Sequence, residues 1–303
     1  MIRFISRHFS PLTLSAMRRL AIALVLLPFA ASGALPVETV FKGRAKFDTL
    51  VAQADAWKPL PIGERVAAVG RALVGTRYKG FTLEIDDRIE APSVNLEGLD
   101  CWTFFESALA FARMLDEPRE NWSPQTMLTY IERDRYRGGS CDGTYLSRLH
   151  YLEEWIIDND RRGLVQNLTT ALGGTRVAHT AGEMTINWRG YRYMRASADV
   201  RAGIRAMEQR VAAMPMAHIP KNKVASIESK LRSGDIISIT TNDPGGVGTS
   251  HVGLALRTAD GVLHFMHASS PNNAGKVVID MRLSDYLNHY RADAGIMVAR
   301  PLR

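Results

Sequence analysis

Apolar residues recur every three or four positions in several stretches of the first two thirds of the chain, a spacing typical of helices that bury one face. Residues 61–75 show it clearly, with Val66, Val69 and Leu73 on one side and Gly75 as the stop signal. The same signals predict three further helices, at 123–135 with Ser123 before Pro124, at 145–158 and at 198–214.

Residues 99–115 are apolar on nearly every side, which predicts a buried helix. Asp100 is a good N-cap residue, so Cys101 should lie in the first turn of this helix. A thiol at that position has a lowered pKa, because the helix dipole and the free amides favour the thiolate. Cys101 is therefore a candidate nucleophile. The alternative is a buried cysteine that only fills the core.

The last third changes to short runs of β-branched residues, which predict strands. The expected strands are 236–240, 251–258, 262–269, 276–279 and 295–299, with a glycine-rich loop at 244–248. Residues 81–95 fit an irregular strand or loop, and 162–197 fit further strands. A helical half followed by a strand-rich half predicts an α+β fold, with 35–303 as a single domain.

The hairpin between 251 and 269 has two possible registers, and the register decides which histidines share a face. If residues 260–261 form a two-residue turn, His251 shares its face with His264. If 259–261 form a three-residue loop with a left-handed glycine, His251 shares its face with His267. The second register is favoured because it collects five apolar residues on one face: Val252, Leu254, Leu256, Val262 and Met266.

In the favoured register His251 and His267 are diagonal neighbours whose rings can meet. Gly253 and Ala255 lie on the same face, and their small size suggests that the Cys101 helix approaches there. A cysteine activated by a histidine that a third polar group orients is the general arrangement for nucleophilic acyl transfer. His264 is expected to be structural.

The first 34 residues have the three parts of a secretory signal peptide: basic Arg18 and Arg19, an apolar run at 20–29, and small residues up to Ala34. An uncleaved membrane anchor is the alternative, and Met17 is a second possible start. Removing the leader takes away four arginines, so 38 − 4 = 34 basic residues face 31 acidic ones and the net charge falls from +7 to +3. That charge gives no reason to expect nucleic-acid binding.

Only two cysteines, Cys101 and Cys141, are present in a chain that is expected to leave the cytoplasm. A disulfide between them is the alternative to a free nucleophile. The two settings differ, because Cys101 precedes an apolar helix and Cys141 lies in a turn-like, glycine-rich stretch.

Several motifs together resemble a known family. The runs Leu-Asp-Cys-Trp at 99–102, Gly-Thr-Arg-Tyr at 75–78, Ser-His-Val-Gly at 250–253 and Phe-Met-His-Ala-Ser at 265–269 are similar to the NlpC/P60 superfamily of papain-like cysteine peptidases. The runs 148–155, 219–221 and 234–237 resemble its DUF1460 subfamily, which is similar to N-acetylmuramoyl-L-alanine amidases.

The resemblance implies a papain-like core, in which a helix carries the cysteine and an antiparallel sheet carries the histidine pair, with a large insertion at about 142–217. It implies Cys101 as nucleophile, His251 as general base and His267 as the third polar residue. Tyr78 matches the tyrosine that helps to hold the oxyanion. Substrate-contact candidates within the insertion are Arg148, His150 and Tyr151.

The activity implied by the resemblance is hydrolysis of the amide between N-acetylmuramic acid and L-alanine in peptidoglycan fragments, anhydro forms among them, without a metal. The leader pattern predicts an exported, periplasmic protein, and we expect a monomer that needs no cofactor. Related proteins usually have an aspartate before the Ser-His pair, where this chain has Gly248 and Thr249.

Three other functions remain open from the sequence. A zinc amidase would use His251, His264 and His267 as ligands, although a carboxylate partner is not evident. An endopeptidase acting within the stem peptide would use the same cysteine machinery. A module that binds wall fragments without cutting them would keep only the cleft.

Overall fold

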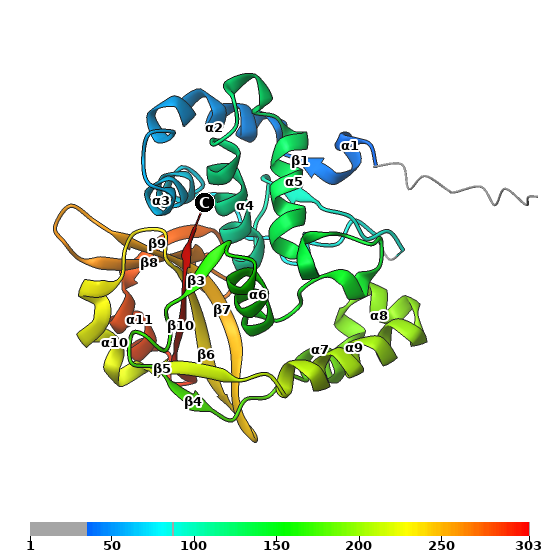
Figure 1. The fold of residues 1–303 in the computed structure, drawn as a ribbon, viewed down its shortest axis with the longest axis vertical. Coiled ribbons are helices and arrows are strands. Elements are labelled where there is room, and N and C mark those ends of the chain that lie inside the picture. The colour runs from blue at the N-terminus through cyan, green and yellow to red at the C-terminus, as the bar shows by residue number, and fades with distance from the viewer. Residues whose placement is uncertain (1–34, 87, 303) are drawn as a thin grey trace, which may run out of the picture. The chain divides into compact units, whose positions relative to one another are not determined.

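An antiparallel sheet lies at the centre of the computed structural model, which describes residues 35–86 and 88–302 (Figure 1). Its strand order is β4-β5-β10-β6-β7-β8-β9, and β3 pairs with β10. The strands are β3 (Val165–Asn167), β4 (Thr175–Val177), β5 (Met216–Pro220), β6 (Ile236–Asp243), β7 (Gly246–Arg257), β8 (Leu263–Ala268), β9 (Val277–Arg282) and β10 (Asp293–Pro301). The expected signal peptide, residues 1–34, lies outside the described residues.

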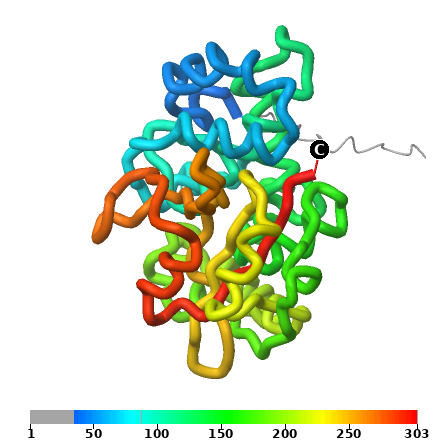
Figure 2. The backbone as a smooth tube through the Cα atoms, turned by 90° about the vertical axis from the view of Figure 1, so that its left-hand side faces the viewer, coloured from blue at the N-terminus to red at the C-terminus, as the bar shows by residue number. Residues whose placement is uncertain are grey.

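Helices cover both faces of this sheet. Figure 2 shows the N-terminal helical segments above the strands of the C-terminal third. One face packs on α3 (Ile62–Ala72) and α4 (Cys101–Met114), and the other packs on α11 (Leu283–His289). The remaining helices are α1 (Val37–Val40), α2 (Arg44–Trp57), α5 (Pro124–Arg135), α6 (Leu152–Arg161), α7 (Glu183–Ile186), α8 (Arg192–Ala196), α9 (Ala198–Ala212) and α10 (Lys221–Ile227).

Two smaller features complete the fold. The short strands β1 (Phe41–Lys42) and β2 (Val94–Asn95) pair in parallel near the N-terminus. The helices α7, α8 and α9 share a separate cluster of buried side chains that includes Met184, Tyr193 and Met207. No helix among the described residues has the length and apolar character needed to cross a membrane.

The predicted helices at 61–75, 99–115, 123–135 and 198–214 are confirmed as α3, α4, α5 and α9. The helix predicted at 145–158 is wrong in its first half, where a 3-10 turn at Tyr145–Ser147 precedes extended backbone and α6 begins at Leu152. Arg148 pairs there with Tyr136 in an antiparallel bridge, so tertiary hydrogen bonding replaces the local helix.

The strands predicted across 162–197 are only partly present. β3 and β4 lie in the first part of this range, but residues 183–196 form α7, a 3-10 turn and α8 instead. Of the aromatic residues that resembled a strand pattern there, Tyr193 is buried on α8, while Trp188 and Tyr191 pack partly buried against the same cluster. The glycine-rich loop expected at 244–248 is also shorter than predicted, because β7 already begins at Gly246.

The hairpin register is confirmed. Leu254 lies opposite Met266, and the Thr258 amide donates to the Val262 carbonyl over 3.0 Å, as the three-residue loop requires. Gly261 has the expected left-handed φ of 82°. His251 and His267 therefore share one face of the sheet.

The expected approach of the Cys101 helix to Gly253 and Ala255 is wrong. Instead, α4 shares a core cluster with the opposite face of the hairpin, which carries Leu254 and Met266. Gly253 serves a different contact, since a Cβ atom there would lie 2.5 Å from the Met266 carbonyl oxygen and 2.8 Å from the His267 Cβ. The missing side chain lets β8 and its histidine lie close to β7.

A buried ion pair fixes the position of α4. Glu106 of α4 accepts a hydrogen bond of 2.7 Å from Nε of Arg135 at the end of α5, and both side chains are at most 1% exposed. Arg135 also donates to the Ser93 carbonyl over 2.9 Å, which connects the segment before α4 to the same charge.

We expect Arg135→Met to lower the free energy of unfolding by about 3–5 kcal/mol, because it leaves the Glu106 carboxylate buried without its partner. The double variant Glu106→Leu/Arg135→Met should recover most of the loss. Chemical denaturation measures both. Arg44→Met removes the exposed pair with Asp48 and, as the control, should cost about 1 kcal/mol or less. A double variant as unstable as the single one would contradict this account.

Candidate active site

The start of α4 is fixed by a capping box. The Asp100 carboxylate accepts from the Thr103 amide over 2.8 Å, and the Thr103 hydroxyl accepts from the Asp100 amide over 2.9 Å. These two bonds satisfy free donors of the first turn and set the direction in which the helix begins. Cys101 is the first residue of α4, as the sequence predicted.

The Cys101 thiol faces β7, where the main-chain amide of Val252 lies within hydrogen-bonding reach of the sulfur. Burial raises the pKa of Cys101 to about 12, and the neighbouring Asp100 carboxylate acts in the same direction. The expectation of a lowered pKa is therefore wrong for the unliganded protein. Loss of hydration disfavours the thiolate more than the amides of Val252 and Trp102 favour it.

The two histidines form a direct hydrogen bond. Nε2 of His251 and Nδ1 of His267 are 2.7 Å apart, and the two rings are nearly perpendicular. Nε2 of His267 in turn lies 3.1 Å from Oδ2 of Asp280 on β9. Burial lowers the pKa of His251 to about 3, with a further contribution from His267, so His251 is a neutral imidazole around pH 7.

A β-bulge precedes His251. Ile239 of β6 lies opposite His251, but the next residue, Thr240, lies opposite Thr249, so Ser250 is the extra residue. Bulges of this kind redirect side chains and are frequent beside active sites. The Ser-His pair that marked the family resemblance is thus also a local irregularity of the strand.

Asp280 was not identified from the sequence. It lies two residues after Val278, which is directly opposite His267, so strand alternation places it on the His267 face. That signal requires the register between β8 and β9, which the eight residues of the connecting loop do not define.

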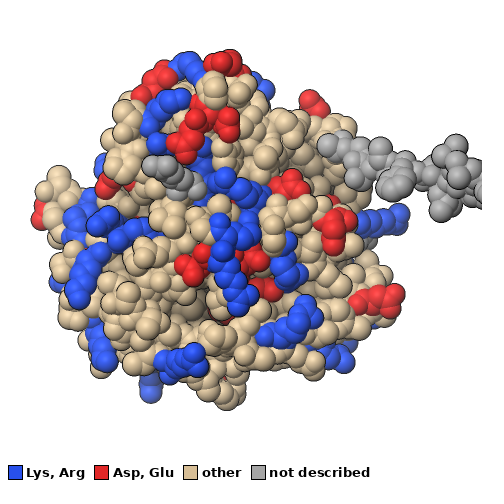
Figure 3. Space-filling model, in the orientation of Figure 1, with Lys and Arg blue, Asp and Glu red and all other residues tan. Residues whose placement is uncertain are grey.

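A cavity of about 570 Å³ contains the predicted catalytic pair. Six of the seven predicted site residues line it, namely Tyr78, Cys101, Arg148, His150, Tyr151 and His251. His267 is 2% exposed and lies behind His251. The face in Figure 3 has basic and acidic side chains interspersed, with acidic ones near its centre.

Tyr78 lies close to both Cys101 and Asp100. Burial raises the pKa of Tyr78 to about 12, and these two neighbours add to the shift. The phenol therefore keeps its proton at neutral pH and remains a hydrogen-bond donor. A bridge between Tyr78 and Leu99 holds its backbone beside the start of α4.

The other three predicted contacts have their polar groups engaged within the protein. Arg148 binds both carboxylate oxygens of Glu90, at 3.0 and 2.5 Å. Nε2 of His150 lies 2.8 Å from the Tyr145 carbonyl oxygen, and the Tyr151 hydroxyl donates to Glu208 over 2.6 Å. These residues shape the cavity wall, and direct contact with substrate stays a prediction for them.

His264 lies apart from the catalytic pair. Its Nδ1 is 2.7 Å from the Asp280 carbonyl oxygen, and strand alternation places it on the opposite face from His267. Within residues 35–86 and 88–302, no group of three or more His, Cys, Asp or Glu side chains is arranged to hold a metal ion. Cys101 and Cys141 are both free thiols.

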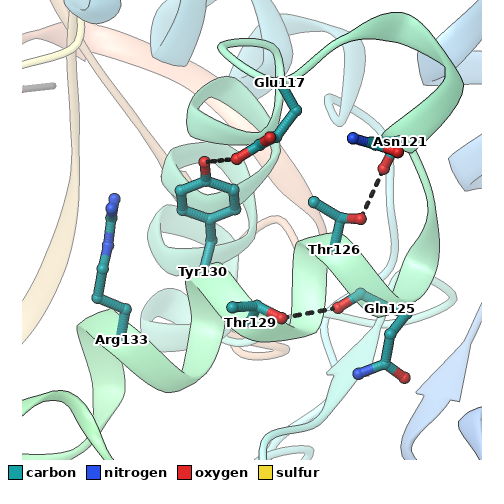
Figure 4. A pocket seen from close by; sticks show the side chains of 7 residues that line it. All are labelled: Glu117, Asn121, Gln125, Thr126, Thr129, Tyr130 and Arg133. Carbon is teal, nitrogen blue, oxygen red and sulfur yellow. Dashed lines mark hydrogen bonds between the residues drawn. The ribbon is translucent and has the colours of Figure 1, made fainter.

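A second depression lies on α5 and has a different character. Figure 4 shows the Tyr130 hydroxyl donating to Glu117 over 2.8 Å, and the Thr126 and Thr129 hydroxyls donating to main-chain carbonyl oxygens. Its lining contains no cysteine or histidine. The cavity at Cys101 is therefore the better candidate for chemistry.

The chain is a mixed α/β protein with an antiparallel sheet, and two of three comparisons with known proteins place it in the amidase-like hydrolase class. A family model described as N-acetylmuramoyl-L-alanine amidase-like (AmiA-like) matches residues 68–296. The chain belongs to this family. No curated protein gave a significant match.

Solved structures agree with this assignment. An N-acetylmuramoyl-L-alanine amidase from Bacteroides uniformis is similar at 31% identity and a TM-score of 0.71, covering 80% of this chain and 99% of its own. A Bacteroides fragilis protein, provisionally named a xylanase, has 34% identity and a TM-score of 0.68, with 77% and 99% covered. A Legionella pneumophila DUF1460 protein shares the fold at 19% identity and a TM-score of 0.64, with 86% and 94% covered.

A buried carboxyl group lies behind the cavity wall. Oε2 of Glu153 accepts from the Thr249 hydroxyl over 2.8 Å, while Oε1 has no hydrogen-bond partner among the described residues. Burial raises the pKa of Glu153 to about 7. The folded state thus favours the protonated acid, and its stabilising contribution is lost as the pH rises from the unfolded pKa through 7.

We expect the change in the free energy of unfolding caused by Glu153→Gln to be more favourable at pH 8 than at pH 5 by about 2–3 kcal/mol. The reason is that the amide cannot ionise. Denaturant unfolding of both proteins at the two pH values measures this difference. Exposed Glu120→Gln serves as the control and should show no such pH dependence. An equal effect of Glu153→Gln at both pH values would contradict the prediction.

Proposed function

We propose that the protein is a cysteine amidase that hydrolyses the bond between N-acetylmuramic acid and L-alanine in peptidoglycan fragments. The observation that carries this proposal is the cavity that Cys101, at the start of α4, lines together with His251. Membership of the amidase-like family supports the bond that is cut. The papain-like NlpC/P60 assignment belongs to the same proposal.

The reaction starts from a neutral thiol and a neutral imidazole. As the Cys101 sulfur attacks the amide carbon, Nδ1 of His251 accepts the thiol proton, because Nε2 is hydrogen-bonded to His267. In the proposed reaction, the first amides of α4 and the Tyr78 hydroxyl stabilise the oxyanion.

The second half of the reaction returns the proton. The tetrahedral intermediate collapses with cleavage of the C–N bond, and His251 protonates the departing amine of the stem peptide. Water then attacks the thioester with His251 as base, which releases the muramic acid carboxyl group and restores the thiol.

The cellular location follows as part of the proposal. The leader pattern at 1–34 supports export, and a periplasmic enzyme would meet wall fragments released during turnover. The proposed enzyme acts as a monomer and needs no cofactor.

We expect Cys101→Ser to lose activity by roughly 10³-fold or more, because the hydroxyl is a far weaker nucleophile in this site. Mass spectrometry of defined muropeptide digests measures cleavage. Cys141→Ser is the matched control and should cleave like the wild type, with iodoacetamide still inactivating it. Full activity of Cys101→Ser would exclude the mechanism, and products cut within the stem peptide would show an endopeptidase instead.

Tyr78→Phe should reduce kcat by roughly 10²–10³-fold with little change in KM, because one oxyanion donor is lost. Steady-state kinetics on a muropeptide substrate tests this. Tyr130→Phe removes a phenol in the separate depression on α5 and should leave both constants unchanged. Equal kcat values for Tyr78→Phe and the wild type would remove Tyr78 from the mechanism.

A further inference from the structure

We propose that Asp280 is a positioning residue that fixes which ring nitrogens of His267 and His251 carry protons. This inference deepens the proposed function and rests on it, because it concerns how the base of that reaction is prepared. Its basis is a continuous chain of hydrogen bonds from the β9 carboxylate through two imidazoles.

The Asp280 carboxylate is fixed at both oxygens. Oδ2 lies 3.1 Å from Nε2 of His267, and Oδ1 accepts from the Met281 main-chain amide over 2.7 Å. The strand is irregular at this point, since His264 pairs with Arg282 but Met266 pairs with Ile279, which leaves residues 280–281 opposite one residue of β8. Such a bulge directs the Asp280 side chain and its neighbouring amide to one place.

The proton positions follow from the chemistry of each group. The hydrogen bond from His267 lowers the pKa of Asp280, so the carboxylate is ionised and can only accept. In the neutral form of His267, Nε2 therefore carries the proton and Nδ1 is an acceptor. Nε2 of His251 must then donate to it, which leaves the lone pair of His251 on Nδ1.

The same proton positions explain why the Asp280 carboxylate affects His251, the proposed base. If both tautomers were reversed, Nδ1 of His251 would carry a proton and could not accept one from Cys101. Asp280 stabilises the useful arrangement and, during the reaction, the positive charge that develops on the imidazole pair.

Other titratable groups around Asp280 come from two elements. His267 and the main-chain contact with His264 belong to β8, while Tyr286 and His289 belong to α11 and Tyr290 follows it. Burial and the nearby Asp280 charge raise the pKa of Tyr286 and Tyr290, so both phenols stay neutral near pH 7. Asp280 is thus the anionic group among these neighbours that accepts from His267.

The Met281 main-chain amide determines how an asparagine side chain would be oriented in Asp280→Asn. The amide N–H of Met281 requires an acceptor, so the Asn carbonyl oxygen should occupy the Oδ1 position and its NH₂ group should face His267. That donor forces Nε2 of His267 to accept, which reverses both tautomers. Asp280→Ala only removes the partner and leaves the tautomers free to exchange.

We expect Asp280→Asn to lower kcat for muropeptide cleavage by about 10²–10⁴-fold, the loss expected for a base in the wrong tautomer, with KM little changed. Asp280→Ala should lose less than Asp280→Asn, and Asp280→Glu should recover part of the activity. Asp285→Asn is the control, since it removes an exposed carboxylate from α11, and it should behave like the wild type.

Two readouts are independent of substrate. Nitrogen-15 NMR of labelled histidines should show Nε2–H tautomers for His251 and His267 in the wild type and Nδ1–H tautomers in Asp280→Asn. In a Cys141→Ser background, the rate of Cys101 alkylation by iodoacetamide at pH 7 should fall in the same variant.

These readouts separate the two proposals. Changed tautomers and slower alkylation, in a protein that cleaves no muropeptide, would uphold the role of Asp280 while rejecting the amidase. Nε2–H tautomers that persist in Asp280→Asn, or a loss in Asp280→Ala as large as in Asp280→Asn, would overturn the role of Asp280.

Discussion

The hydrogen bond between His251 and His267 depends on one constraint, the register of the β7–β8 hairpin. A slip of one residue would move His267 to the other face of the sheet and leave His251 without its partner. The left-handed Gly261 sets the loop length, and Gly253 provides the close approach that the His267 side of β8 needs. The position of the two histidines therefore depends on backbone conformation at residues up to ten positions away from His251.

The cysteine reaches this hairpin from a different layer. The core of α4 packs on the apolar face of β7, and Cys101 in the first turn of the helix lines the same cavity as His251. The Asp100 cap and the buried Glu106–Arg135 pair fix the direction and depth of that helix. Moving α4 by a fraction of an ångström would change the position of the sulfur relative to Val252 and His251, and catalysis is sensitive to such shifts.

Sequence patterns were sufficient where one local rule dominates. Capping chemistry placed Cys101, and strand alternation with a three-residue loop paired His251 with His267. Sequence patterns failed where residues distant in the chain determine the backbone conformation. Arg148 is an example, because its bridge to Tyr136 and its hydrogen bonds to Glu90 replace the predicted helix. The pKa of Cys101 was also misjudged, because the dipole is visible in a sequence and the degree of burial is not. Asp280 required a strand register that sequence alone leaves open.

Burial makes charge separation in the site unfavourable and strengthens the electrostatic interactions there. The partly buried thiol of Cys101 and imidazole of His251 are neutral at rest. In the proposed reaction, forming their ion pair is therefore unfavourable until a substrate carbonyl accepts the sulfur. The same low-dielectric surroundings strengthen the interaction of every fixed dipole with the developing charges.

In such a site the oxyanion needs hydrogen-bond donors that are already in position, and the imidazolium needs an anion already in position behind it. The first turn of α4 with Tyr78 fits the former requirement, and the chain from His267 to the partly exposed Asp280 fits the latter. Asp280 keeps its charge because it accepts a hydrogen bond from His267 and is only partly buried, whereas a carboxylate in direct contact with His251 would share the burial of that residue. His267 therefore connects the Asp280 charge to the more buried His251. A carboxylate placed directly beside His251 would tend to be protonated, as the raised pKa of buried Glu153 illustrates.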